Sequence, residues 1–277
     1  MYRLIYGAGV NPGAGIGEIV LDNDGMDLGL TDRVYIVTGG TRGLGKAAAH
    51  ALVAEGAKVV VSSRSAGNVE ACVAELGAGS TVGVVADNAD VQTPGALVSA
   101  ARQRFGRLDG MLISVGGPPA GSLLGMTDEQ WRASFESIFL GALRLATTVA
   151  PELPSGGSIV FVLSTSAKQP IANLAMSNGL RPGLAMAAKT LADELGPRGI
   201  RVNGLLPGRV NTERVQELDA ATDDPAKALA AHTKTIPLRR YGRPEEFGRA
   251  AAFLLSPGSA YITGAMLPVD GGLTRPL

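Results

Sequence analysis

The stretch Thr38-Gly39-Gly40-Thr41-Arg42-Gly43-Leu44-Gly45 decides how this chain folds. A short apolar run, 34–37, precedes it, and an alanine-rich helical pattern follows it. A helix that begins after such a turn offers free N–H groups and a partial positive charge. Glycines let the backbone turn tightly and come close to a ligand. Strand, glycine turn and helix in this order are typical of a loop that holds the pyrophosphate of a dinucleotide.

Outward from this turn, apolar runs and helical patterns alternate along the chain. The patterns predict strands at 33–38, 58–62, 81–86, 109–114, 158–163, 200–205 and 265–269, and helices at 44–55, 68–76, 94–105, 128–149, 174–195 and 244–255. Apolar strands separated by helices indicate a parallel sheet covered on both faces. The predicted fold class is therefore α/β, a doubly wound Rossmann-type sheet of about seven strands that binds ligands at the carboxyl ends of its strands.

Composition and patterning limit the domain organisation. The chain has 277 residues, of which 45% are hydrophobic and 18% charged, a balance that supports a sizeable core. Residues 1–25 are rich in glycine and asparagine and lack a helical period, so we predict a disordered N-terminal extension there. No Pro/Gly-rich linker interrupts 26–277, which we interpret as one dinucleotide-binding catalytic domain.

Charge and residue types exclude several classes of function. The 25 basic residues balance the 25 acidic ones, so no net field favours nucleic acid or an anionic membrane. No apolar run reaches the ~20 residues that span a bilayer, and no secretion signal is visible, so a cytoplasmic location is predicted. Cys72, the only cysteine, is predicted to be buried, and His50 and His232 lie far apart, so no metal site is expected.

Three further motifs accompany the glycine turn. Asn203-Gly204-Leu205-Leu206-Pro207-Gly208 follows the sixth predicted strand, Gly242-Arg243-Pro244-Glu245-Glu246 opens the last helix, and Val269-Asp270-Gly271-Gly272 lies near the C-terminus. With these motifs and the TGxxxGxG pattern from Thr38 to Gly45, the chain resembles the short-chain dehydrogenase/reductase family, in particular its 3-oxoacyl-carrier-protein reductases, over about residues 28–273. The resemblance implies a nicotinamide dinucleotide cofactor and a small-molecule carbonyl substrate.

The end of the second predicted strand bears on the choice of cofactor. A carboxylate at this point favours NAD, whereas a basic group accommodates the 2′-phosphate of NADP. Here the sequence reads Ser63-Arg64, and Arg42 lies in the nearby turn, so NADP(H) is favoured. The alternative is that Arg64 is a solvated surface residue. The resemblance places Asp87 and Asn88 at the adenine and Pro207, Gly208, Val210 and Thr212 at the nicotinamide, and the whole predicted cofactor site adds Gly39, Thr41, Arg42, Gly43, Leu44, Gly45, Ser63, Arg64, Ser114, Gly116 and Arg181.

The catalytic positions depart from the family pattern. That pattern comprises an Asn, a Ser and a Tyr-x-x-x-Lys, in which the Tyr protonates the carbonyl oxygen while the Lys lowers its pKa and holds the ribose. The Ser aligns with Ser164, or alternatively with Ser166. Counting back from the landmark 190–195 places Ser177 at the Tyr and Arg181 at the Lys. Ile138 stands at the Asn, and the family's NNAG reads Ser114-Val115-Gly116-Gly117.

These departures change the expected proton delivery. A serine hydroxyl is a far weaker acid than a phenol of pKa ~10, and an arginine does not exchange its proton at neutral pH. Arg181, one turn from Ser177, is expected to hold ribose hydroxyls and stabilise an oxyanion, or both residues only pack and bind cofactor. Water, an acidic hydroxyl of the substrate, a relay through Ser164, Ser177 and Arg181, or His232 or Tyr241 would then supply the proton.

The predicted function follows from this balance. A positioned acid contributes ~10²–10⁴-fold, whereas attack geometry supplies effective molarities of ~10⁵–10⁸ M, so loss of the Tyr is compatible with hydride transfer. We predict NADPH-dependent reduction of a ketone or 3-oxoacyl carbonyl to an alcohol with atypical proton delivery. An NADPH-bound sensor or scaffold, and an isomerase or dehydratase, stay open as alternatives.

Two segments are expected to border the substrate, and two helices to form an interface. The polar stretch 212–241 has the composition of a lid, and 118–121 is predicted to form the opposite rim. The resemblance implies a homodimer or homotetramer built through the helices 128–149 and 174–195.

Overall fold

Seven parallel strands form one sheet in the order β3-β2-β1-β4-β5-β6-β7. The computed structural model describes residues 27–220 and 224–275, so the extension predicted at 1–25 lies outside the described residues. The strands are β1 Val34–Thr38, β2 Lys58–Ser63, β3 Thr81–Val85, β4 Gly110–Ile113, β5 Ser158–Val162, β6 Arg201–Pro207 and β7 Met266–Val269. The predicted doubly wound α/β fold is confirmed, and the strand ends agree with the sequence pattern to within one residue or two.

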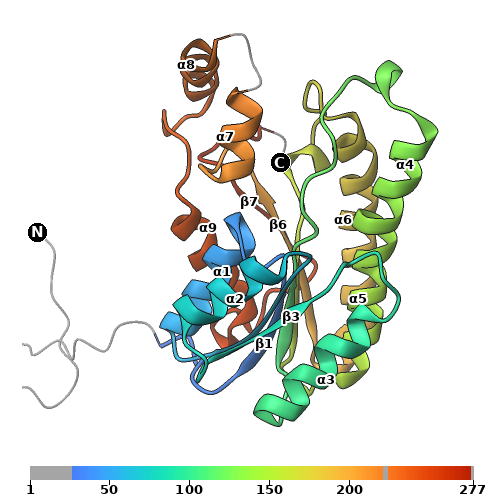
Figure 1. Cartoon of the computed structure of the whole chain (residues 1–277), viewed down its shortest axis with the longest axis vertical. Helices are drawn as coiled ribbons and strands as arrows, with labels where there is room; N and C mark the ends of the chain where they lie inside the picture. The colour runs from blue at the N-terminus through green and yellow to red at the C-terminus, as the bar shows by residue number, and fades with distance from the viewer. Residues whose placement is uncertain (1–26, 221–223, 276–277) are drawn as a thin grey trace, which may run out of the picture.

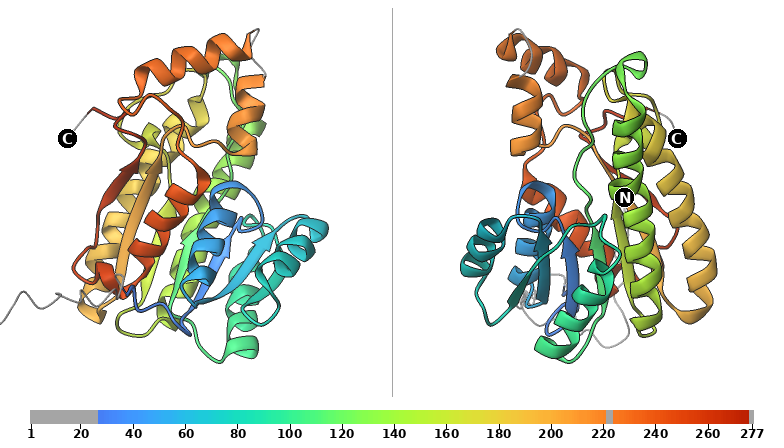
Figure 2. Two further views of the ribbon diagram at one scale, coloured as in Figure 1. Left: turned by 90° about the vertical axis from the view of Figure 1, so that its left-hand side faces the viewer. Right: turned by 45° about the vertical axis from the view of Figure 1, so that its right-hand side comes forward.

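Helices connect the strands and cover both faces of the sheet (Figure 1). They are α1 Gly43–Ala54, α2 Ala66–Leu76, α3 Thr93–Phe105, α4 Asp128–Ser134, α5 Gly141–Val149, α6 Ala175–Leu195, α7 Glu213–Ala220, α8 Pro225–Thr235 and α9 Pro244–Leu255. Short 3₁₀ turns lie at Leu123–Gly125, Ala150–Glu152, Thr165–Ala167, Gly196–Arg198 and Pro257–Ser259. The predicted polar lid thus contains two helices, and Figure 2 shows α7 and α8 as a pair beyond one end of the sheet.

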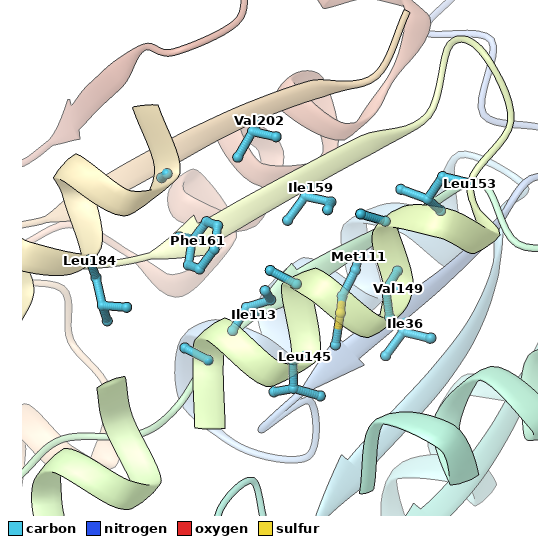
Figure 3. Packing of buried hydrophobic residues seen from close by; sticks show 14 of the residues in the cluster. Ile36, Met111, Ile113, Leu145, Val149, Leu153, Ile159, Phe161, Leu184 and Val202 are labelled. Carbon is cyan, nitrogen blue, oxygen red and sulfur yellow. The ribbon is translucent and has the colours of Figure 1, made fainter. Parts of the chain in front are cut away.

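Two apolar clusters hold the layers together. On one face α3, α5 and α6 pack on the sheet through residues such as Leu97, Leu145 and Leu184, and Figure 3 shows this cluster around Met111 and Phe161. On the other face, α1 and α9 contribute Ala48, Leu52, Phe247 and Ala251, all completely buried. Cys72 belongs to the second cluster and is buried as predicted. Because strands β1, β4 and β5 are buried along their whole length, the order of the sheet is fixed by packing on both faces.

The helix predicted at 128–149 contains a wider π-helical segment. Thr127 and Gln130 form a capping box at its start, and α4 then continues through a π segment, Phe135–Leu140, into α5. The N–H of Gly141 donates to the carbonyl of Glu136, five residues back. A Cβ on Gly141 would lie 2.3 Å from the carbonyl oxygen of Asn88, so only glycine lets the helix pass this loop at the cofactor end of the sheet.

The long helix α6 approaches this segment closely. A Cβ on Gly179 would lie 2.9 Å from the Trp131 ring, and one on Gly183 would lie 2.8 Å from the Phe139 ring. Pro182 lies inside α6, directly after Arg181, and removes one N–H from the helical ladder. The two glycines therefore allow α6 to lie close to this neighbouring helix.

Candidate active-site cleft

A cleft of about 860 Å³ lies at the carboxyl ends of the strands. It spans the point between β1 and β4 at which the strand order reverses, where open α/β sheets bind their ligands. Every residue predicted for the cofactor site and for catalysis lines this cleft: Gly39, Thr41, Arg42, Gly43, Leu44, Gly45, Ser63, Arg64, Asp87, Asn88, Ser114, Gly116, Ser164, Ser177, Arg181, Pro207, Gly208, Val210 and Thr212. The fold brings these residues together, while their roles in binding and catalysis remain predictions.

The glycine turn forms the floor of one half of the cleft. Gly39 and Gly43 have φ values of +56° and +51°, a region that favours glycine. A Cβ on Gly39 would lie 2.8 Å from the carbonyl oxygen of Ser114, and one on Gly45 would lie 2.2 Å from that of Gly39. No side chain caps the start of α1, so the first N–H groups of this helix remain available to a ligand. The turn is thus shaped to admit a phosphate group close to the backbone.

Two arginines, Arg42 and Arg64, line the cleft near the glycine turn and the end of β2. Arg64, directly after β2, is exposed, and no acidic residue stands beside it in the sequence. The Arg42 guanidinium faces two carboxylates of α7, with Nε 4.0 Å from Glu213 Oε1 and Nη2 3.9 Å from Glu217 Oε1. All three of these side chains are at least half exposed, so both ion pairs are long and solvent-screened. The guanidinium of Arg42 can therefore turn to another anion at little cost.

Three serines meet in the other half of the cleft. Ser164 follows β5, lines the cleft and accepts a hydrogen bond of 3.1 Å from the N–H of Ser166. Ser166 lies buried behind it, and its Oγ is 2.9 Å from Oγ of Ser177, the residue at the tyrosine position. Ser164 therefore lines the cleft, whereas Ser166 does not. The Ser177 hydroxyl already has a partner within the protein.

Arg181 extends from α6 between the ends of two strands. Its Nη1 donates to the carbonyl of Val162 at 2.8 Å, and its Nη2 donates to the carbonyl of Gly116 at 2.7 Å. The side chain is 5% exposed, and its buried Nε–H has no partner. Burial alone lowers the pKa of Arg181 to about 10, because no carboxylate among the described residues offsets the loss of hydration. This guanidinium is an electropositive wall of the cleft.

The position of the family asparagine is apolar. Ile138, in the π segment, is 3% exposed and both lines the cleft and joins the apolar core. It offers no side-chain hydrogen bond. The cleft is therefore polar around the glycine turn and the serines, and apolar along one side of its inner half.

The lid and the opposite rim are joined across the cleft. Arg214 of α7 donates to the carbonyl of Pro118 at 3.0 Å, which links the two segments predicted to border the substrate. Sequence reasoning missed Arg214, Glu217, Gln130 and Ser137, which also line the cleft. The helical spacing of Glu213, Arg214 and Glu217 was the available signal, because these residues share the first turns of α7.

His232 and Tyr241 do not line the cleft. They form a network with Asp219 within the predicted lid and with Arg209 just before it. Arg209 donates to Asp219 and contacts His232 Nε2 at 2.9 Å, His232 Nδ1 lies 3.0 Å from Tyr241 Oη, and Tyr241 donates to Asp219 at 2.9 Å. Burial and the bond to Asp219 raise the pKa of Tyr241 to about 12. Neither side chain lines the cleft, so this arrangement does not favour the prediction that either residue replaces the family acid.

A smaller pocket of about 410 Å³ lies at the opposite ends of the strands. Of its two acidic residues, Asp109 accepts hydrogen bonds from Arg107 and from the N–H of Val34, and Glu152 pairs with Arg102, so both charges are already engaged within the protein. Within the described residues, no group of three His, Cys, Asp or Glu side chains is arranged to hold a metal ion. In the same part of the chain, no helix has the length and apolar character to cross a bilayer.

Comparison with known proteins agrees with this geometry. The family model described as enoyl-(acyl carrier protein) reductase matches residues 39–274. A 3-oxoacyl-[acyl-carrier-protein] reductase from Synechocystis is 34% identical over 250 residues, which cover 88% of this chain and 98% of the relative. The chain belongs to the short-chain dehydrogenase/reductase family.

Two solved structures extend the comparison of this short-chain dehydrogenase/reductase. L-sorbose reductase from Gluconobacter frateurii, complexed with NADPH and L-sorbose, has a TM-score of 0.84 and 29% identity, covering 91% of this chain and all of that chain. A short-chain oxidoreductase from Pseudomonas aeruginosa, described as containing an atypical catalytic center, has a TM-score of 0.83 and 30% identity. The match covers 90% of this chain and 100% of that chain.

Proposed function

We propose that this short-chain dehydrogenase/reductase binds NADPH and reduces the carbonyl group of a small molecule, with a proton supplied from outside the usual tyrosine. One observation carries the proposal: a single cleft holds the glycine turn and two arginines at one end, and Ser164 and Arg181 at the other. The first half suits a phosphorylated dinucleotide. The second half suits an oxygen that becomes negatively charged.

The residues present fit the cofactor. The closely packed glycine turn and the uncapped start of α1 would receive the pyrophosphate, and Arg42 and Arg64 would pair with the 2′-phosphate. Pro207, Gly208 and Thr212, at the end of β6, would lie along the nicotinamide. The cofactor would supply a hydride.

Ser164 and Arg181 would act on the substrate oxygen. Ser164 Oγ accepts from the N–H of Ser166, which leaves its own hydroxyl hydrogen to be donated to a ligand in the cleft. Arg181 would stabilise negative charge that develops on the same oxygen, because it is a buried cation without a carboxylate partner among the described residues. The protein would thus hold the oxyanion, and water would complete its protonation.

Binding and turnover of NADPH test this proposal. We expect NADPH to bind the purified protein, measured by calorimetry, and to be consumed on addition of carbonyl compounds, measured by its absorbance. Ser164→Ala is expected to lower kcat/KM by about 10²-fold, since one oxyanion donor contributes ~10²–10³-fold. NADPH binding without consumption over a panel of ketones, quinones and 3-oxoacyl thioesters would contradict it.

A second candidate has one observation in its favour. Because the cleft lacks the family tyrosine and Ser177 is paired with Ser166, the protein would also suit an NADPH-bound sensor without turnover. A stable NADPH complex together with a partner whose affinity depends on NADPH would support it. A cytoplasmic location and a homodimer or homotetramer remain predictions. Phe135 and Met186, on the two helices predicted to form the interface, are exposed apolar side chains and support the oligomer.

A further inference from the structure

Two buried arginines, Arg181 and Arg201, have no carboxylate partner within the described residues. They differ in how many of their N–H groups have a hydrogen-bond acceptor. Arg201 donates to the carbonyls of Leu254, Leu255 and Ser256 and to Oγ of Ser259. Arg181 has only two carbonyl acceptors and an orphaned Nε–H. Arg201 therefore joins parts of the fold, whereas Arg181 keeps an uncompensated charge at the wall of the cleft. Such a charge is costly unless an anion completes it.

The cleft also lacks a group that can give up a proton near neutral pH. Among the described residues that line it, the ionisable side chains are only arginines and carboxylates: Arg42, Arg64, Asp87, Arg181, Glu213, Arg214 and Glu217. No tyrosine, histidine, cysteine or lysine of the described chain lines it. Arginine keeps its proton, and an ordinary carboxylate has lost its own. An oxyanion formed here must therefore be stable enough to wait for water.

We propose that Arg181 is the receptor for a phenolate-type oxyanion, and that the substrate is a quinone-type carbonyl compound, whose reduced product needs no acid from the protein. This inference rests on the proposed NADPH-dependent reduction and adds the substrate class to it. The orphaned cation and the missing acid are complementary features of a site that releases an anion.

The chemistry balances without a further reactant. A quinone that accepts one hydride, with its two electrons, becomes the hydroquinone monoanion, NADPH becomes NADP⁺, and the monoanion takes one proton from water after release. A phenol has a pKa of about 10, whereas an aliphatic alkoxide resembles hydroxide, whose conjugate acid has a pKa of about 15.7. Without an acid, the phenolate is therefore favoured over the alkoxide by about 10⁵–10⁶-fold. Aliphatic ketones should be poor substrates at the same site.

The anion receptor can be tested without turnover. The probe is 4-nitrophenol, whose absorption distinguishes phenol from phenolate, titrated into the protein with and without NADPH. An opposite charge within about 4–6 Å lowers the pKa of an acid by about 1–3 units, so the phenolate should bind about 10–10³-fold more tightly than the phenol. Equal binding of the two forms overturns the proposal.

Variants assign the effect to Arg181. Arg181→Met should abolish the preference for phenolate, whereas Arg181→Lys should retain part of it. The matched control is Lys189→Met, which removes an exposed cation from the same helix and should leave the preference unchanged. Removal of an unpaired buried charge is compatible with folding. If Arg181→Met does not fold, wild type is compared with Arg181→Lys instead. A preference for phenolate over phenol that is tenfold or larger and identical in both proteins would contradict a role for the guanidinium.

Turnover separates this inference from the function on which it rests. With 1,4-naphthoquinone and cyclohexanone as substrates, and the rate without protein subtracted, we expect kcat/KM to be at least 10³-fold higher for the quinone. Comparable rates would refute the substrate class and leave the proposed reductase intact. Phenolate binding at Arg181 with no reduction of either compound would instead contradict the reductase. Reduction of the quinone that Arg181→Met leaves unchanged overturns the receptor.

Discussion

The proposed preference for NADPH over NADH should depend on Arg42 and Arg64, and its size follows from the surroundings of these two side chains. Within the described residues, Arg42 pairs with two carboxylates at 3.9–4.0 Å, and such pairs contribute about 0–1 kcal/mol in water. A charge-assisted hydrogen bond to phosphate contributes about 1.5–3 kcal/mol. Because the side chain is 57% exposed, the lower value of about 1.5 kcal/mol applies to Arg42. For Arg64, which is exposed, about 1 kcal/mol is appropriate.

The double variant Arg42→Gln/Arg64→Gln should therefore lose about 2.5 kcal/mol of NADPH binding, which is about 60-fold in Kd. NADH lacks the 2′-phosphate, so its Kd should change by less than about twofold. Calorimetric titration of both cofactors at low and high salt measures the two numbers, and the loss should shrink as salt screens the phosphate.

Removing a carboxylate beside Arg42 should have the opposite effect on NADPH binding. Glu217→Gln removes a carboxylate that competes with the phosphate for Arg42, so it should tighten NADPH binding by about two- to threefold. Arg198→Gln, at the far end of α6, is the matched control for loss of an exposed arginine. An equal loss of NADPH and NADH binding in the double variant would refute the reasoning, because the arginines would then act on the shared part of the cofactor.

Three further outcomes follow from the site and its supports. Ser177→Tyr/Arg181→Lys should raise kcat/KM for cyclohexanone by about 10²–10⁴-fold, and unchanged rates would show that the missing acid is not what limits aliphatic ketones. Burial and the charge of Arg209 lower the pKa of His232, so the unfolded chain binds more protons than the folded protein as the pH falls through about 6.5. The thermal midpoint of the protein should therefore decrease as the pH falls below about 6.5, and that of His232→Gln should decrease less. An equal decrease of both midpoints would contradict the role of His232 in the network with Arg209. Gly183→Ala should destabilise by about 1–2 kcal/mol, because its Cβ would meet Phe139 at 2.8 Å, whereas Gly95→Ala in the open helix α3 should stabilise by about 0.5–1 kcal/mol, both read from denaturant midpoints.

The sequence was sufficient for the sheet and for the part of the cleft around the glycine turn, but not for the residues that α4 and α7 add to its lining. Continuous apolar strands and glycine stops are local signals, and they placed all seven strands. The glycine turn and the Pro207-Gly208 motif come from distant parts of the chain, yet the ends of parallel strands meet at one edge, so their meeting was predictable.

Side-chain partners could not be predicted in this way. Nothing in the spacing of Ser164, Ser166 and Ser177 shows that the last two bond to each other, because that contact depends on how α6 sits over the loop after β5. The network of Arg209, Asp219, His232 and Tyr241 likewise depends on the angle between α7, α8 and the loop before α9. Composition predicted a polar lid, and only packing shows that His232 and Tyr241 bond within it and do not line the cleft.

The departures at the catalytic positions are best understood as one coupled change. Arg181 can reach the carbonyl of Gly116 because Gly116 has a φ of +66°, which turns this part of the loop after β4 in a way that favours glycine. The same guanidinium holds the end of β5 through Val162, so the ends of two neighbouring strands are tied by one side chain. With the arginine filling this space, Ile138 needs no polar group and instead joins the core. Ser177 is then free to pair with Ser166, which leaves the cleft with a fixed cation and without an acid. A site so arranged is suited to hold an anion, and its chemistry follows from the stability of the anion that it holds.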